Sequence, residues 1–407
     1  MKVLSDDARR TRALAFLNVA HFLDHYVLLI FPTVIIGLEV VYGRSYGELL
    51  ILSTAAFTAF GVFALPCGWL ADYWSRRGMM AIFFLGTGIS TIAVGLSPNF
   101  TILSIALFAV GVFAAIYHPV GIPMVIDNAI HRGRTMSWNG VYGNVGVSIA
   151  AGCTGIITTV FGWRYAFFIP GVICTAVGIA YLLMSPDDSG RKVAPQIRAQ
   201  DVRLDRRSTL VIITLFMSLS VSSGLLFNSL SITLPKIVDV KTGVDIPLAL
   251  ASSLATVIFL CGAATLLLMG RLVERFQPHL LLAAIGLLQV LGSVWSYYAS
   301  GWILMVALAL SIASIYGQVT LGDFLMARYT SPNWRGRLYA FRFFLVLTPS
   351  GLAVWGMGWL YDHGGVKLLL AMAISVAVLF ALNALAISYM VSDVESRRAR
   401  GAAQPAE

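Results

Sequence analysis

Long apolar runs joined by short polar connectors make up most of the chain. An α-helix needs about 20 mostly apolar residues to cross the hydrocarbon core of a bilayer. Twelve runs reach that length: 14–38, 47–71, 79–97, 101–126, 136–160, 164–184, 209–235, 247–270, 279–299, 301–326, 338–361 and 365–391. The pattern therefore predicts an all-α, polytopic membrane protein with twelve transmembrane helices.

The longest connector, residues 185–208, is polar and contains two prolines. Six predicted spans precede it and six follow it, which makes it the natural boundary between two domains. We expect an N-terminal six-helix bundle over 1–184, a cytoplasmic linker over 185–208 and a C-terminal six-helix bundle over 209–407.

Composition and charge narrow the class of protein. Hydrophobic residues make up 58% of the chain and charged residues only 12%, whereas soluble proteins carry about 25% charged residues. A water-soluble enzyme is therefore excluded. The net charge of +9 does not indicate a nucleic-acid partner, because the basic residues are spread over short loops.

The distribution of these basic residues predicts the orientation in the membrane. Of the 28 Lys and Arg residues, 22 lie on one side of the predicted spans, and such an excess marks the cytoplasmic side. Both termini and the linker are on that side. We expect a multi-pass protein of the bacterial inner membrane.

Two short motifs recur at nearly the same distance along the chain. The run GWLADYWSRRG (68–78) is followed 202 residues later by GRLVERF (270–276), and RGR (132–134) is followed 203 residues later by RGR (335–337). These matches indicate a duplicated six-helix unit. Parallel repeats of this kind place a substrate site near the membrane midplane, between the two halves.

The Gly-x-Leu-Ala-Asp-x-x-x-Arg-Arg-Gly run at 68–78 resembles the signature loop of the major facilitator superfamily. The resemblance implies transport by alternating access, a central cavity lined by spans 1, 4, 7 and 10, and a monomer. It also implies that the loop latches the two halves, so Asp72, Arg76 and Arg77 are candidate gating residues. In the simpler alternative, the arginines only follow the positive-inside rule.

Three further motifs resemble the fosmidomycin-resistance branch of that superfamily. They are HFLD (21–24) with Pro32 in span 1, IYHP (116–119) in span 4 and GNVG (143–146) in span 5.

Ionisable residues within the spans are the best candidates for a site, because each is costly at bilayer depth. His21, Asp24 and His25 share one helical face by their i, i+3, i+4 spacing. Asp24 lies roughly 15 Å, and His118 roughly 12 Å, from the cytoplasmic end of its span at 1.5 Å per residue. Since spans 1 and 4 both line the cavity implied by the resemblance, these two residues could face each other.

Three interpretations of these four residues remain open. Asp24, His118, His21 and His25 could bind a proton or the substrate. They could instead be divalent-metal ligands, because imidazole and carboxylate groups suit such ions. In the third interpretation they have no role in transport, and their side chains only form hydrogen bonds with backbone groups and pack helices together.

Other polar residues in the spans are secondary candidates. Ser222 and Asn228 in span 7 and Gln318 in span 10 could line the substrate cavity or join helices by hydrogen bonds. Arg342 and Asp323, near the cytoplasmic ends of spans 11 and 10, could act in gating. In the simpler account, Arg342 extends its charged end to the membrane surface.

No phosphate-binding loop, zinc-protease motif or nucleophile elbow occurs in a suitable context. We therefore expect neither enzymatic activity nor a cofactor. The leading hypothesis is a secondary active transporter that exports a small organic molecule or drug in exchange for protons. Alternatives are a carrier of a divalent metal such as iron, and a non-transporting membrane sensor or assembly partner.

Overall fold

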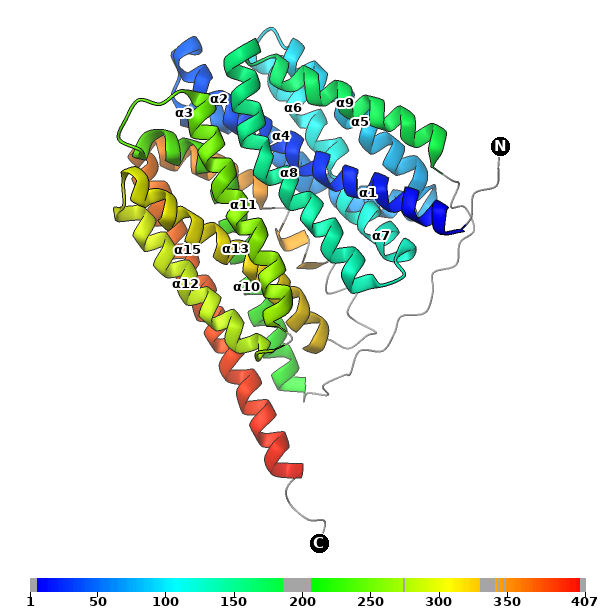
Figure 1. Ribbon diagram of the computed structural model, residues 1–407, viewed down its shortest axis with the longest axis vertical. Coiled ribbons are helices and arrows are strands. Elements are labelled where there is room, and N and C mark those ends of the chain that lie inside the picture. Colours follow the sequence, from blue (N-terminus) through cyan, green and yellow to red (C-terminus); the bar gives the residue numbers. More distant parts are fainter. Residues whose placement is uncertain are drawn as a thin grey trace. The chain divides into compact units, whose positions relative to one another are not determined.

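The computed structural model describes residues 6–185, 206–273, 275–329, 341–342, 344–346 and 349–402. Within these ranges every regular element is a helix (Figure 1). The helices are α1 (Asp6–Leu28), α2 (Ile30–Tyr42), α3 (Tyr46–Ile51), α4 (Thr54–Tyr73), α5 (Arg76–Leu96), α6 (Phe100–Ala114), the π-helical turn η1 (Tyr117–Gly121), α7 (Ile122–Asn128), α8 (Arg132–Phe161), α9 (Tyr165–Met184), α10 (Arg206–Lys241), α11 (Leu248–Leu272), α12 (Pro278–Tyr298), α13 (Gly301–Tyr329) and α15 (Ser350–Ala402). The predicted all-α class is confirmed.

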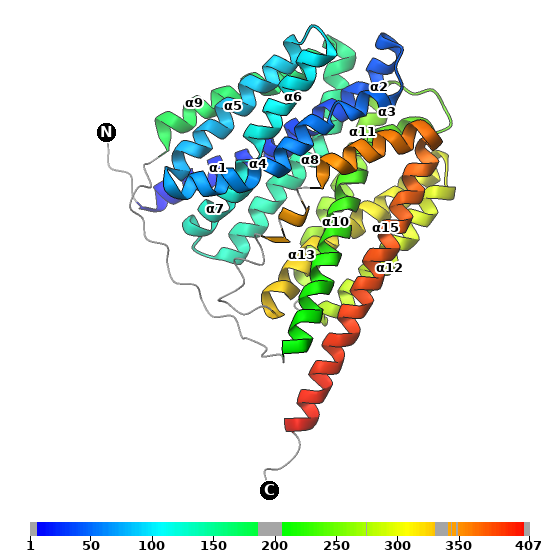
Figure 2. The ribbon, with the colours of Figure 1, turned by 180° about the vertical axis from the view of Figure 1, so that it is seen from behind.

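The described residues form eleven helical stretches that are long and apolar enough to cross a membrane. The last of them, Phe344–Asp393, has 50 residues, or about 75 Å at 1.5 Å per residue. That length exceeds two hydrocarbon cores of about 30 Å each. α15 bends along its course (Figure 2), and Gly365 has non-helical angles of φ 59° and ψ −155°. These spans are consistent with the twelve predicted.

Some sequence predictions fall outside this description. The linker expected at 185–208 lies there almost entirely, and so does part of the span expected at 338–361. The division into bundles at that linker therefore stays a prediction.

Large apolar side chains are exposed along most of the helices. Examples are Val40, Ile105, Leu183, Leu267 and Leu352. An apolar surface of this extent is unfavourable in water. In hydrocarbon it is required, and helices also satisfy their own backbone polar groups there. The chain is therefore a polytopic membrane protein.

Contacts within the chain group the residues into two compact units. The first comprises Met1–Gln196, Asn228–Leu260 and Leu347–Leu369, and the second comprises Ile197–Phe227, Cys261–Val346 and Leu370–Glu407. In the second unit α12 packs along α13. In the first, α5 packs along α9 and α1 along α8 (Figure 1).

The core of the first unit is a cluster of buried apolar and aromatic side chains. It includes Leu17, Phe83, Phe84, Tyr117 and Tyr181, from α1, α5, η1 and α9. Where α8 crosses α1, a Cβ on Gly146 would lie 2.3 Å from the carbonyl oxygen of Phe22. Glycine is therefore needed for the backbones of the two helices to come this close.

Two local breaks interrupt the spans that carry the polar candidates. Span 1 breaks between α1 and α2, three residues before Pro32, whose ring cannot donate the helical hydrogen bond to Leu28. Span 4 contains η1 around Pro119. Single π-turns inside α-helices are frequent at functional sites, and η1 carries His118.

Candidate functional site

Asp24 and His118 lie side by side in the first unit. Asp24 on α1 is fully buried, and its Oδ2 is 3.4 Å from Nε2 of His118 on η1. The structure thus brings together the two residues whose similar depth suggested that they could meet.

The carboxyl group of Asp24 has few polar contacts. Among the described residues, neither of its oxygens makes a hydrogen bond of good geometry, and 3.4 Å is long for one. A buried charge without hydrogen bonds is costly. The environment therefore suits a group that exchanges a proton or receives a ligand, rather than a permanent structural ion pair.

Three histidines form a compact group beside Asp24, which we call the histidine cluster: His21, His25 and His118. The ring centroids of His21 and His25 are 5.0 Å apart, and each lies 5.5 Å from that of His118. Two positive charges at such distances would repel each other.

Asn139 of α8 connects the helices around this cluster and is fully buried. Its backbone oxygen is 2.8 Å from Nδ1 of His21, and its Oδ1 accepts a hydrogen bond of 3.0 Å from the Tyr117 hydroxyl. Its Nδ2 donates to Oδ1 of Asn18 at 3.0 Å and to the Leu17 carbonyl at 3.4 Å. Sequence reasoning did not single out Asn139 as a functional residue.

Gly143, one turn beyond Asn139, provides the space for the His21 ring. A Cβ at this position would lie 2.5 Å from Nε2 of His21 and 2.7 Å from two of its ring carbons. On the same helix, a Cβ on Gly140 would meet nothing within 4 Å.

The Gly143→Ala substitution is accordingly expected to displace His21. Overpacking of this kind costs about 1–3 kcal/mol, so the midpoint of thermal unfolding of the purified protein in detergent should fall. Gly140→Ala is the matched control and should be neutral or stabilising, because alanine favours helices by about 1 kcal/mol over glycine. An equal effect of both substitutions would contradict the assigned packing.

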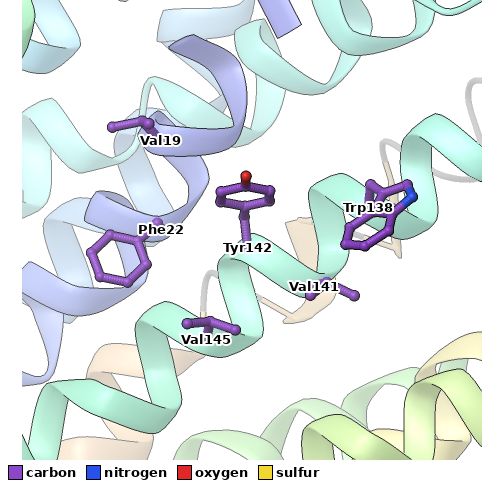
Figure 3. A pocket seen from close by; sticks show the side chains of 6 residues that line it. All are labelled: Val19, Phe22, Trp138, Val141, Tyr142 and Val145. Atoms are coloured by element: carbon purple, nitrogen blue, oxygen red, sulfur yellow. The ribbon is translucent and has the colours of Figure 1, made fainter. Parts of the chain in front are cut away.

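An apolar groove of about 330 Å³ lies on a neighbouring face of the same two helices. Figure 3 shows its lining side chains: Val19 and Phe22 come from α1, and Trp138, Val141, Tyr142 and Val145 come from α8. Because this lining carries no charged group, the groove has no evident part in proton or metal chemistry. The polar face of α8, with Asn139, is the one that contacts the histidine cluster.

Comparison with known proteins identifies the family. The model of the Major Facilitator Superfamily matches residues 14–242, more than half of the chain. The chain belongs to the Major Facilitator Superfamily. It is therefore a transporter rather than an enzyme.

Solved structures support the fold of this superfamily over the whole chain. The crystal structure of a bacterial homologue of the human lysosomal transporter Spinster, in an inward-facing and occupied conformation, aligns with a TM-score of 0.67 and 14% identity. The alignment covers 95% of this chain and 96% of that one. The unoccupied form gives a TM-score of 0.69.

Curated relatives are similar only in part. A protein named "Probable L-galactonate transporter" of Escherichia coli (strain K12) is 26% identical over 35% of this chain and 32% of its own length. A puromycin resistance protein of Streptomyces alboniger is 28% identical over 34% of this chain and 29% of its own length. The matches span about a third of these relatives, so their cargoes do not transfer directly.

The loop that resembles the superfamily signature joins α4 to α5 and is held by arginines. Arg76 contacts Asp72 at 3.1 Å and Asp127 of α7 at 2.9 Å. Arg77 donates to the carbonyl oxygens of Leu182 and Ser185 at 2.7 and 3.1 Å, so it caps the end of α9. This capping role was not expected from the sequence.

The polar candidates of spans 7 and 10 differ in their surroundings. The Ser222 hydroxyl donates to carbonyl oxygens of its own helix, at 3.0 Å from both Ser218 and Leu219, so these bonds do not join two helices. Asn228 donates to the Ser350 hydroxyl at 3.3 Å. Gln318 is only 2% exposed, and neither polar atom of its amide has a hydrogen-bond partner among the described residues.

The gating candidates Arg342 and Asp323 are only partly described. Arg342 is half-buried, and its guanidinium lies 3.9 Å from the position that a Cβ on Gly322 would take. The Asp323 side chain lies outside the described residues. A gating role for these two residues stays a prediction.

A second charged group in the first unit was not anticipated. Lys236 of α10 contacts Glu39 of α2 at 2.5 Å and Asp239 at 3.1 Å, and its ammonium lies 5.6 and 5.9 Å from the ring centroids of Tyr46 and Tyr361. We call these five residues the Lys236 cluster. From the sequence, Lys236 was placed in a loop. Glu39 follows span 1 and Lys236 follows span 7 on the same predicted side of the membrane, and this placement could have indicated that the two residues pair.

Proposed function

We propose that this chain is a proton-coupled secondary transporter that exports a small organic molecule across the bacterial inner membrane. The observation that carries the proposal is the fully buried Asp24 carboxyl group, 3.4 Å from His118 and without a well-formed hydrogen bond among the described residues. In this proposal the chain acts as a monomer with both termini in the cytoplasm.

The coupling follows from the cost of a buried charge. In alternating access, the site is open to one side of the membrane at a time. When Asp24 is open to the more acidic side, it takes up a proton, and the neutral carboxyl group is compatible with a closed site. When the site opens to the cytoplasm, the proton leaves and cargo takes its place. The histidine cluster shares the resulting change of charge.

Gln318 and Asn228, from the second predicted half of the chain, are each proposed as a residue that contacts cargo. The role of Gln318 is supported by its buried amide, which makes no hydrogen bond with the described residues. Buried amides normally make hydrogen bonds, so cargo is proposed to supply the partner. Asp72 and Arg76 are proposed as gating residues, because their ion pair and the contact of Arg76 with Asp127 tie two helix ends together.

The relatives supply candidate cargoes, and the motifs that resemble the fosmidomycin-resistance branch agree with export. Resistance to puromycin and to lincomycin is named for two relatives from Streptomyces, and an L-galactonate and a hexose phosphate transporter are named for others. We take these four compounds as probes.

Transport in proteoliposomes tests the coupling. The purified full chain is reconstituted with a trapped pH-sensitive dye, and radiolabelled puromycin, lincomycin, L-galactonate or a hexose phosphate is supplied in turn. For the carried compound, an imposed pH gradient should drive accumulation, and a protonophore should reduce it to the level of protein-free vesicles. Transport that proceeds at the same rate with and without the gradient would remove proton coupling.

A divalent-metal carrier is the second candidate, favoured by the histidine cluster. One ring nitrogen from each of the three histidines lies within 4.8 Å of the others. Nitrogens that bind one ion at about 2.0–2.1 Å must lie closer together than that, so the rings would have to converge. Calorimetric titration with Fe²⁺ and Zn²⁺ distinguishes the candidates: micromolar binding that is lost in His118→Ala favours metal, and its absence in the wild type eliminates it.

A further inference from the structure

The apolar groove between α1 and α8 is accessible from outside the first unit and has large aromatic side chains in its lining. Trp138 is 54% exposed and Tyr142 is 41% exposed, and Phe22 contributes a third ring from α1 (Figure 3). The volume of about 330 Å³ is at the lower end of the range for pockets that hold small molecules. Because the lining is almost wholly apolar, it suits a hydrocarbon chain better than a polar compound.

A cation lies on the same face of α8 as the groove. Arg134, Trp138 and Val145 share this face, because they are separated by four and then seven residues. Along the helix axis, Arg134 is about 6 Å from Trp138 and about 16 Å from Val145, at 1.5 Å per residue. Figure 3 shows Trp138, Tyr142 and Val145 following one another along α8. The helix therefore presents a cation first, then aromatic rings, then aliphatic side chains.

This order matches the layers of one leaflet of a bilayer. Basic side chains bind anionic headgroups at the membrane surface, and tryptophan and tyrosine prefer the interface below them. On each side of the hydrocarbon core, that interface is about 5–7 Å thick, which agrees with the distance from Arg134 to Trp138 along α8. The groove thus begins at the depth where acyl chains begin.

Arg134 is available to bind an anionic group. Its side chain is exposed, and it makes no ion pair or hydrogen bond with the residues that the structure describes. Arg76, by contrast, contacts both Asp72 and Asp127. Because α8 begins at Arg132, the positive end of the helix dipole lies close to Arg134 as well. The charge at this end of the groove therefore favours a negative headgroup.

We propose that the groove holds an acyl chain of an anionic phospholipid whose phosphate is bound by Arg134. Trp138 and Tyr142 contact the glycerol region of this lipid, and Val145 and Phe22 contact the chain. The lipid covers the seam between α1 and α8 beside the face that contacts the histidine cluster, and it stabilises the packing of these two helices. The site depends neither on the cargo nor on proton coupling.

Quenching of Trp138 fluorescence by brominated lipids tests this site. The full chain is reconstituted into phosphatidylcholine vesicles with rising fractions of phosphatidylglycerol brominated on its acyl chains, or of brominated phosphatidylcholine. The chain has nine tryptophans, so the Trp138 signal is taken as the difference between the wild type and Trp138→Phe. Half-quenching should need about fivefold less of the anionic lipid, the ratio that one arginine near an anionic surface provides.

Substitutions at the two ends of the groove separate the headgroup from the acyl chain. Arg134→Gln should remove the preference for the anionic lipid, whereas Arg134→Lys keeps the charge and should retain most of it. Val145→Phe narrows the groove and should raise the fraction of brominated phosphatidylglycerol needed for half-quenching. Arg271→Gln is the matched control, because Arg271 is also exposed at the predicted cytoplasmic end of a span but belongs to the second unit. It should leave the preference unchanged.

Two results would show that only ordinary boundary lipid covers the groove and would overturn the proposal. One is equal quenching of wild-type Trp138 by both brominated lipids, and the other is a preference that survives Arg134→Gln. Puromycin, added at a fixed lipid composition, tests cargo as the occupant. Relief of the quenching would assign the groove to cargo and overturn the proposal, whereas unchanged quenching supports the lipid.

Discussion

Asp24→Asn should abolish gradient-driven accumulation, reducing it to the level of protein-free vesicles. Asparagine has nearly the shape of aspartate but cannot bind and release a proton. The substituted side chain therefore stays in the neutral form throughout the cycle, and the proton gradient can no longer be linked to cargo movement. Exchange of labelled for unlabelled cargo without a gradient should also fall, because in the proposed cycle cargo binds after the proton has left Asp24. Both rates are measured in the same proteoliposomes.

The control for this prediction is stability. Because Asp24 is fully buried and has no well-formed hydrogen bond among the described residues, a neutral amide should leave the thermal midpoint equal or higher. Loss of transport with an unchanged midpoint identifies a functional defect. Asp24→Glu retains a titratable carboxyl group and should recover part of the coupling. Full gradient-driven transport by Asp24→Asn would contradict the proposed mechanism.

The fold could largely be predicted from composition, whereas its local breaks could not. A run of about 20 apolar residues has few alternatives to a transmembrane helix. The exact path of the backbone depends on packing, however. Pro32 and Pro119 were visible in the sequence, but nothing in it indicated that span 4 forms a π-turn at η1.

The candidate site was predictable only where charge itself was the signal. Asp24, His21 and His25 were identified because ionisable residues are rare inside spans, and depth arithmetic suggested His118 as their neighbour. Asn139 was missed because a transmembrane helix with apolar residues on all sides gives no indication of which face turns toward its neighbours. Which face of α8 meets α1 is decided by close packing at Gly146, which becomes apparent only in three dimensions.

The Lys236 cluster provides the largest expected effect on stability. Lys236 is 6% exposed, and the two carboxylates that it contacts are each about a quarter exposed or less. Lys236→Met keeps the aliphatic stem but removes the cation, so Glu39 and Asp239 are left as neighbouring, poorly hydrated negative charges. Breaking a buried pair by removing one partner costs about 3–5 kcal/mol. The unfolding midpoint in detergent should therefore fall more than for any other substitution discussed.

A double-mutant cycle separates the charge effect from the loss of packing. If the penalty arises from unpaired carboxylates, adding Glu39→Gln to Lys236→Met should restore part of the stability, with a coupling of about 0.5–3 kcal/mol. Lys241→Met on the same helix is the matched control, and a partly exposed lysine there should change stability by no more than about 1 kcal/mol. A double variant as unstable as the sum of its single variants would show that the ion pair contributes nothing.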